Sequence, residues 1–219
     1  MKKSTTTKPK SDPRPKVKPK AASGHSVSTS PKSRPDRDCP LCPRLVAFRE
    51  DNRAAHPDWF NAPVPQFGPI AAPLLIVGLA PGLQGANRTG RPFTGDYAGD
   101  LLYQTLLDYG FAAGTYQARP DDGLKLTGCR ISNAVRCVPP QNKPTTAEIH
   151  TCRPFLIETI KEMPRLRAIV TLGRISHDST LKALGLTLRP SSMAANSSMT
   201  RSACSAAIIA RDTTPTPAC

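Results

Sequence analysis

The sequence predicts an α/β domain in which helices cover both faces of a parallel sheet. Three short runs with strand patterns lead into Gly- or Pro-containing loops, at residues 73–80, 128–138 and 166–173, and the first of them is continuously apolar. Such runs are typical of strands that are buried on both faces. Segments with helical patterns alternate with them along the chain. Because strand–helix alternation places helices above and below the sheet, we expect parallel strands between two helical layers.

The helical segments have recognisable spacing and end signals. Residues 97–110 place leucines and a tyrosine at helical spacing and close with a glycine. A second helix begins where Thr145 and Glu148 form a capping-box pattern. Pro154 lies inside this pattern and is expected to kink or restart the helix. Residues 174–185 predict a last helix, closed by a glycine.

The N-terminal segment differs in composition from the predicted domain. The chain has 219 residues and a net charge of +14, and residues 1–38 hold eleven Lys or Arg against three Asp. With almost nothing apolar to bury, this segment is expected to be disordered. Its charge suits a polyanion partner, or it serves only as a solubilising tail. Neither a secretory signal nor a membrane-spanning run is found, so we expect an intracellular protein.

Three loops follow the three predicted strands, at residues 78–96, 132–144 and 171–174. Ligands of parallel α/β sheets bind beyond the carboxyl ends of the strands, so these loops predict one binding edge. The first loop is rich in glycine, which lets a backbone approach a ligand closely. It lacks the Gly-Lys-Ser/Thr ending of a nucleotide triphosphate loop, and its glycines lack the spacing of a dinucleotide fingerprint.

The loop sequences GLAPGLQGANRTGRPFTGD and NAVRCVPPQNKP resemble those of the family 5 (B-type) uracil-DNA glycosylases. The resemblance covers residues 39–185. It implies a three-layer α/β/α fold with a central, mostly parallel four-stranded sheet. It also implies a monomeric DNA-repair enzyme, acting at the nucleoid in the cytoplasm. Such an enzyme flips uracil and other deaminated bases out of DNA and hydrolyses the N-glycosidic bond, leaving an abasic site.

The resemblance also implies substrate-binding residues. Phe93 is similar to the aromatic residue that stacks on the extruded base, and Asn133 to the asparagine that reads the pyrimidine edge. An amide suits this role because it donates and accepts hydrogen bonds at once. Gly78, Ala80 and Gly82 belong to the backbone that approaches the substrate. Two structural alternatives stay open: core packing for Phe93 and capping of a strand end for Asn133.

The catalytic acid must be chosen among carboxylates near the first loop. In the sister family 4, an acidic residue occupies the position where this chain has Leu79, as family 5 members do. We therefore assign Asp96 as the catalytic residue, which orients the attacking water or stabilises positive charge on the sugar. Asp100, four residues on, is the competing candidate, although its position favours a solvated helical face.

Four of the seven cysteines match the iron–sulfur site of families 4 and 5: Cys39, Cys42, Cys137 and Cys152. Four thiolates hold either a [4Fe–4S] cluster or a zinc ion, and spacing alone does not choose between them. The resemblance favours the cluster, with a structural role in attaching the N-terminal segment to the sheet. Cys129 is expected to be an ordinary buried thiol.

Residues 186–219 do not continue the family pattern. Family members end in a loop resembling Ser-Tyr-His-x-Ser-Arg-x-Asn-Thr-x-Thr-Gly, whose histidine contacts the uracil carbonyl and which inserts into DNA. One permitted set of codons for residues 206–219, regrouped from its third base, encodes Ser-Tyr-His-Cys-Ser-Arg-Tyr-Asn-Thr-Asn-Thr-Gly-Val. We therefore hypothesise a frameshift between about Gly185 and Ser191, which makes residues 186–219 an aberrant tail.

These expectations define three alternatives. The first is an active uracil-DNA glycosylase with a basic arm (1–38), a catalytic domain (39–185) and an out-of-frame tail (186–219). The second is a DNA-binding, catalytically impaired remnant that lacks the histidine loop. The third is a zinc-bound nucleic-acid module.

Overall fold

The computed structural model describes residues 33–186 and 206–210. Of the two compact units into which the chain divides, residues 1–30 and 31–219, the first lies outside this part of the chain. The expected disorder of the basic arm therefore falls outside the described residues as far as residue 32, as does most of the predicted aberrant tail. The description that follows concerns the second unit.

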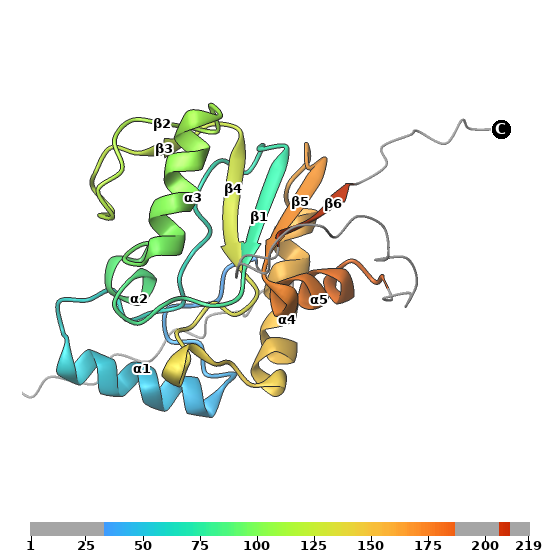
Figure 1. Cartoon of the computed structure of the whole chain (residues 1–219). Helices are drawn as coiled ribbons and strands as arrows, with labels where there is room; N and C mark the ends of the chain where they lie inside the picture. The colour runs from blue at the N-terminus through green and yellow to red at the C-terminus, as the bar shows by residue number, and fades with distance from the viewer. Residues whose placement is uncertain (1–32, 187–205, 211–219) are drawn as a thin grey trace, which may run out of the picture. The chain divides into compact units, whose positions relative to one another are not determined.

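A mixed sheet forms the centre of this unit (Figure 1). Its strands are β1 (Leu74–Gly78), β4 (Cys129–Asn133), β5 (Ala168–Leu172) and β6 (Ala206–Ala210), in the order β4-β1-β5-β6. β1 pairs in parallel with both β4 and β5, whereas β6 pairs antiparallel with β5 at the edge. The three predicted strands are thus confirmed as parallel neighbours, and each is shorter than its predicted run because the run continues into a loop.

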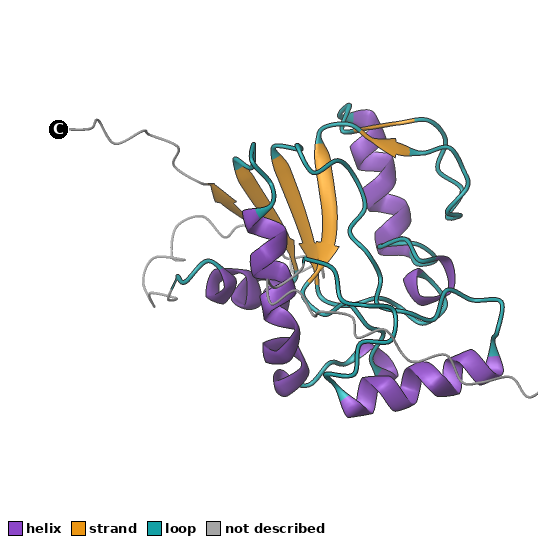
Figure 2. Ribbon diagram, turned by 180° about the vertical axis from the view of Figure 1, so that it is seen from behind, coloured by secondary structure: helices purple, strands orange, loops and turns teal. Residues whose placement is uncertain are grey.

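Helices lie on both faces of the sheet, as Figure 2 shows from behind. α3 (Tyr97–Asp108) covers one face, where its Tyr103 and Leu106 pack with residues of β1 and β4. α4 (Thr146–Lys161) and α5 (Arg174–Ala183) cover the other face, where Leu156 of α4 packs with residues of β1 and β5. The predicted three-layer α/β/α architecture is confirmed.

Several elements were not predicted from the sequence. They are α1 (Pro43–Ala55), α2 (Ala86–Thr89), the hairpin of β2 (Ala112–Ala113) with β3 (Lys125–Leu126), and a 3-10 turn, η1 (Pro140–Asn142). α1 gives a weak sequence signal because its buried face consists of Leu45, Arg49 and Asn52, two of which are polar. α2, β2, β3 and η1 are too short to produce a periodic pattern.

The predicted helix ends can be compared with the structure. Thr145 caps α4, and its side chain and that of Glu148 form the expected reciprocal capping box. α4 runs through Pro154 without a break, so the helix does not restart there. Gly185 has a φ of +71°, the left-handed conformation that ends a helix, as predicted for α5.

Two segments at the ends of the described part differ from the predicted organisation. Residues 33–38, which we assigned to the basic arm, contact the domain: Ser33 accepts a hydrogen bond from Gln66, and Asp38 pairs with Arg53 at 2.7 Å. Residues 206–210, which we assigned to the aberrant tail, form strand β6. Within the described residues, no helix is long and apolar enough to cross a membrane.

Candidate active site

The loops that follow β1 and β4 form a pocket beyond the carboxyl ends of these two strands. Five predicted site residues line it together with Ala86 and Thr94, namely Ala80, Gly82, Phe93, Asp96 and Asn133. They come from two parts of the sequence that parallel pairing places side by side, since Gly78 is the register partner of Asn133. The structure therefore brings together the residues of the two sequence motifs.

Gly78 lets the Phe93 ring and the Asn133 amide approach each other. A Cβ atom on Gly78 would lie 2.4 Å from Cζ of Phe93 and 2.5 Å from Oδ1 of Asn133. No real Cβ atom approaches its neighbours so closely, so only glycine fits between these two groups. The predicted backbone approach at Gly78 thus serves the side chains of the pocket itself.

The Asn133 side chain is buried and incompletely hydrogen-bonded. The residue is 3% exposed, and its Oδ1 atom has no hydrogen-bond partner among the described residues. An unpaired buried polar atom is costly, and in functional sites it commonly faces a ligand. Asn133 ends β4 but does not use Oδ1 to cap the strand. Its geometry is that of a group that awaits a hydrogen-bond donor.

The two carboxylate oxygens of Asp96 have different surroundings. Asp96 is the N-cap of α3, where its Oδ1 accepts a hydrogen bond of 2.7 Å from the backbone N–H of Gly99. Its Oδ2 lies 4.0 Å from the position that a Cβ on Gly82 would occupy, on the pocket side. The cap fixes the carboxylate and leaves one oxygen for the pocket. The competing Asp100 is exposed in the first turn of α3 and does not line the pocket.

Leu79, at the position where the resemblance implied an acidic residue in family 4, packs against the four-cysteine region. It contacts a buried apolar cluster that includes Leu45 of α1 and Val135, and neighbouring Ala80 packs against the same cluster. Ala80 also lines the pocket. The first loop therefore connects the pocket on one side to the cysteine region on the other.

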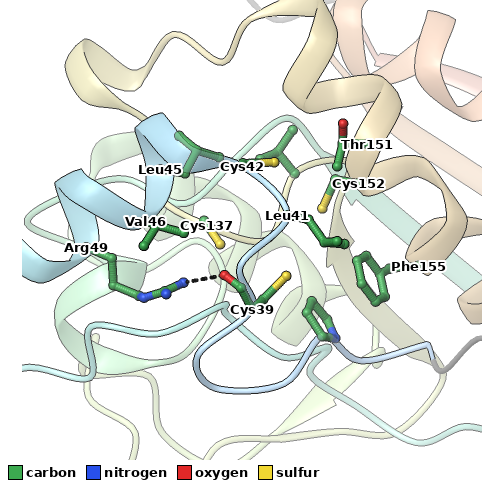
Figure 3. Close-up of a pocket in the computed structure, with 12 residues that line it drawn as sticks. Cys39, Leu41, Cys42, Leu45, Val46, Arg49, Cys137, Thr151, Cys152 and Phe155 are labelled. Atoms are coloured by element: carbon green, nitrogen blue, oxygen red, sulfur yellow. Dashed lines mark hydrogen bonds between the residues drawn. The ribbon is translucent and has the colours of Figure 1, made fainter. Parts of the chain in front are cut away.

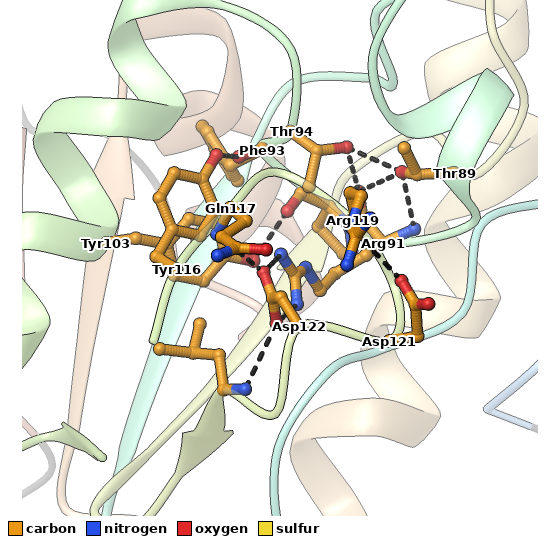
Figure 4. Close-up of polar contacts among 12 residues, drawn as sticks. Thr89, Arg91, Phe93, Thr94, Tyr103, Tyr116, Gln117, Arg119, Asp121 and Asp122 are labelled. Atoms are coloured by element: carbon orange, nitrogen blue, oxygen red, sulfur yellow. Dashed lines mark hydrogen bonds and ion pairs between the residues drawn. The ribbon is translucent and has the colours of Figure 1, made fainter. Parts of the chain in front are cut away.

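A buried ion pair lies next to the loop that carries Phe93 (Figure 4). Arg91 donates two hydrogen bonds to Asp122, of 2.8 and 2.6 Å, and the Asp122 side chain is fully buried. Asp122 also accepts backbone N–H bonds from Gln117 and Leu124. The Arg91 guanidinium, followed by these N–H donors, holds the pKa of the Asp122 carboxyl well below its usual range. The pair ties the loop of residues 115–124 to the pocket.

The backbone of Phe93 is strained. Its φ is +55°, a left-handed conformation that a bulky side chain rarely adopts. Such a residue costs about 1–3 kcal/mol and persists only where the surrounding structure imposes the conformation. Strain of this kind at a pocket residue favours a functional role over simple core packing.

The four predicted cysteine ligands line a second pocket (Figure 3). Cys39 and Cys42 precede α1, with Cys42 as its N-cap residue; Cys137 follows β4, and Cys152 lies on α4. Burial raises the pKa of the Cys137 thiol to about 12 and that of Cys152 to about 11. The backbone N–H of Arg136 donates to Sγ of Cys152 at 3.4 Å. Three separate elements thus meet at these thiols.

The spacing of these thiols can be compared with the two candidate occupants. Among the described residues, no three His, Cys, Asp or Glu side chains converge closely enough to bind one metal ion. Zinc binds each thiolate at about 2.3 Å, so its four sulfur atoms lie within about 4 Å of one another. A [4Fe–4S] cluster binds each cysteine through a different iron atom and accepts a wider arrangement. Four cysteines around one pocket are a donor set that either occupant uses.

The chain was compared with known proteins. The model of the Uracil DNA glycosylase superfamily matches residues 65–211. The chain belongs to the uracil-DNA glycosylase superfamily. A type-5 uracil-DNA glycosylase of Thermus thermophilus is 45% identical over 154 residues, which cover 68% of this chain and 69% of the relative. A type-5 enzyme of Pyrobaculum aerophilum is 39% identical, with 68% of each chain covered.

A type-4 uracil-DNA glycosylase of Pyrobaculum aerophilum is also similar to the chain. It is 33% identical over 150 residues, which cover 68% of this chain and 62% of the relative. The identity to the type-5 relatives is higher, in agreement with Leu79 at the position where family 4 is acidic. The resemblance to family 5 of this superfamily is therefore confirmed.

The motif analysis of this uracil-DNA glycosylase superfamily member missed the residues that support the pocket. These are Arg91, Tyr103, Tyr116 and Asp122. Arg91 lies within the first motif, but nothing in the sequence shows that its side chain is buried. Nothing in the local sequence distinguishes Asp122 from its neighbour Asp121, which is exposed. Cys129 is a fully buried thiol in the core, as predicted.

The Arg91–Asp122 pair predicts a pH-dependent contribution to stability. Because the folded-state pKa of Asp122 is depressed, its stabilisation is fully present above the unfolded-state pKa, near 4, and disappears as the pH falls further. Replacing Asp122 by Asn leaves Arg91 without its buried partner and is expected to reduce the free energy of unfolding by about 3 kcal/mol at pH 7. Urea unfolding of both proteins measures this difference.

The difference between wild type and Asp122→Asn should shrink between pH 5 and pH 2. Asp121→Asn is the matched control. The Asp121 side chain is 75% exposed, and its ion pair with Arg119, at 3.5 Å, is long and lies in solvent. This substitution should change stability much less at every pH. A difference between wild type and Asp122→Asn that stays constant down to pH 2 would contradict the assignment.

Proposed function

We propose that the protein removes uracil from DNA by hydrolysing the N-glycosidic bond, as a base-excision repair enzyme. The observation that carries this proposal is the unpartnered Oδ1 atom of buried Asn133, which faces Phe93 across Gly78 in a pocket that Asp96 also lines. The pocket supplies an edge reader, a stacking ring and a carboxylate, and it lies in a chain of the uracil-DNA glycosylase superfamily. The names of the relatives support an active enzyme over a DNA-binding remnant.

Phe93 and Asn133 recognise the base after it leaves the duplex. A base inside the stack cannot reach a pocket, so a glycosylase extrudes it and binds it there. Stacking of a base on an aromatic ring contributes about 1–3 kcal/mol. The Asn133 Oδ1 atom accepts a hydrogen bond from the imide N–H of uracil, and its amide N–H donates to a neighbouring carbonyl. Cytosine presents no imide N–H at this position, and the same contacts would leave Asn133 unsatisfied.

Asp96 acts on the sugar and the water. As the bond to uracil breaks, positive charge develops on the deoxyribose, and a fixed carboxylate stabilises it. The bond from Gly99 N–H to Oδ1 holds the side chain in place, while Oδ2 remains free to orient the attacking water. Water attack leaves an abasic site, and the motifs position no lysine for a further cleavage of the DNA strand.

We propose that Cys39, Cys42, Cys137 and Cys152 hold a [4Fe–4S] cluster with a structural role. The four side chains line one pocket, and the resemblance to family 5 supports a cluster over zinc. The cluster, when bound, supplies cations that convert the buried thiols to thiolates. Through these four cysteines, the cluster would join the start of α1, the loop after β4 and α4 into one unit.

The basic arm and the remaining substrate range extend the proposal. The net charge of residues 1–38 supports attraction to the phosphate backbone of DNA and association with the nucleoid. We propose that other deaminated bases are excised as well as uracil, and that the protein acts as a monomer.

We also propose that the chain beyond about residue 185 is translated out of frame. The support is that residues 206–219 permit a codon set which, when regrouped, encodes the histidine-loop sequence. The family match runs to residue 211 in the frame as written and by itself favours that frame. Sequencing the gene tests the idea directly. Codons for residues 206–219 that regroup into the histidine-loop sequence are expected, and codons that do not regroup would end the hypothesis.

Single-turnover excision from a uracil-containing duplex tests the catalytic assignment. Asp96→Asn keeps the helix cap, because Asn is as good an N-cap residue as Asp, but it loses the charge. We expect excision to slow by about 10²-fold or more with little change in stability. Asp108→Asn, which changes an exposed aspartate at the far end of α3, is the matched control and should excise at nearly the wild-type rate. Equal rates for Asp96→Asn and wild type would refute the role of Asp96.

Metal analysis of the purified chain tests the cofactor. We expect a brown protein that contains iron and inorganic sulfide, and Cys137→Ser should lose both colour and iron. Cys129→Ala, which changes a buried cysteine outside the four-cysteine pocket, should keep them. A colourless protein with stoichiometric zinc would overturn the cluster and favour the zinc-bound alternative.

A further inference from the structure

Three successive backbone carbonyls at the pocket each accept a hydrogen bond from a side-chain hydroxyl. Thr94 Oγ1 donates to the carbonyl of Arg91 at 3.0 Å, and Tyr103 Oη donates to that of Pro92 at 2.7 Å. Tyr116 Oη shares its proton between the carbonyl of Phe93, 3.4 Å away, and the carboxylate of Asp100. A strand or helix would bind these carbonyls through backbone N–H groups, but here the side chains do so. The backbone of residues 91–93 is therefore held by Thr94 from the same loop and by two tyrosines from other elements.

The two tyrosines are themselves fixed. Their rings stack with centroids 4.5 Å apart, and the Arg91 guanidinium lies 5.3 Å from the Tyr103 ring centre and 5.4 Å from that of Tyr116. Asp122 holds the same guanidinium through two hydrogen bonds. Tyr103 comes from the middle of α3 and Tyr116 from the loop between β2 and β3 (Figure 4). The hydroxyl groups thus approach the backbone of residues 91–93 from rigid surroundings.

The conformation that these contacts impose is the strained one. Phe93 has a φ of +55°, and Gly99 of α3 leaves room for its carbonyl: a Cβ on Gly99 would lie 2.1 Å from that oxygen. The same backbone geometry sends the ring across Gly78 to Asn133. A relaxed φ at Phe93 would turn the ring away from the pocket, so the hydrogen bonds to residues 92 and 93 decide where the ring lies.

We propose that Tyr103 and Tyr116 are positioning residues that hold the Phe93 ring against the extruded base. Neither side chain lines the base pocket, so both act through the backbone of Pro92 and Phe93. The inference rests on the proposed function, because it assumes that Phe93 stacks on the base. It adds that the stacking surface is prepared before DNA binds, by two hydroxyl groups outside the pocket.

A double-mutant cycle on single-turnover excision by the full chain tests the proposal. Tyr103→Phe and Tyr116→Phe each remove one hydroxyl and keep the stacked ring. We expect each to slow excision about tenfold at subsaturating enzyme, mainly through weaker binding of the uracil-containing duplex. In a Phe93→Ala background, which lacks the ring to be positioned, the same substitutions should have almost no further effect.

Tyr109→Phe is the matched control, because Tyr109 is 77% exposed at the end of α3 and should excise at the wild-type rate. Tyr103→Phe changes a fully buried side chain and could fail to fold. Tyr116 is only half-buried, so Tyr116→Phe should fold normally and keeps the proposal testable. If the tyrosine effects persist in full without the Phe93 ring, the hydroxyls are only structural and the proposal is overturned. Wild-type rates for both variants would overturn it too.

The same cycle separates this inference from the proposed function. No excision by the wild-type chain would refute the glycosylase assignment, and the positioning role would fall with it. A normal rate for Phe93→Ala would remove the stacking role that the inference assumes. Slow excision by Phe93→Ala with unchanged tyrosine variants would leave the glycosylase intact and reject the positioning role alone.

Discussion

The buried pair of Arg91 and Asp122 is the interaction on which the base pocket depends. Two charges are removed from water here, and the cost is offset because they hydrogen-bond to each other and Asp122 also receives two backbone N–H groups. The aromatic rings around Arg91 shield the pair further. The loop of residues 115–124, which contributes no strand of the main sheet, thereby becomes part of the pocket's support.

The pocket and the cysteine region share a wall. Leu79 and Ala80 follow β1 directly, and both pack against the cluster that includes Leu45 and Cys152. A polar or acidic side chain at Leu79 would face this apolar cluster and lose solvation. Asp96, the carboxylate that we propose for catalysis, lies at the start of α3, where the helix N-terminus stabilises negative charge.

Much of the fold and site could be predicted from the sequence, for identifiable reasons. β1 is apolar throughout, β4 and β5 are short runs that end in loops, and the end of α3 and start of α4 carry ordinary stop and cap signals, so local pattern was sufficient. Gly78, Phe93, Asp96 and Asn133 were found because they lie in two contiguous motifs. The support for the pocket was not found, because it joins Arg91 to Asp122 across 31 residues.

The elements that escaped prediction also have physical reasons. α1 buries Arg49, whose guanidinium donates to the carbonyl of Cys39, and Asn52, which bonds within the helix. Its inward face therefore does not stand out as apolar. β6 depends on pairing with β5, a contact between residues far apart in the sequence. Local composition carries no information about such a partner.

The segment after strand β4 could make the base pocket depend on the supply of iron in the cell. Strand β4 ends at Asn133, which we propose reads the base, and Cys137 follows four residues later, a distance of at most about 14 Å along the chain. If the four cysteines hold a cluster, the segment that carries the amide is anchored by iron at its far end. A cell starved of iron would then produce a repair protein with every pocket residue in its sequence and a poorly fixed Asn133. Its mutation rate at deaminated bases would follow its iron status.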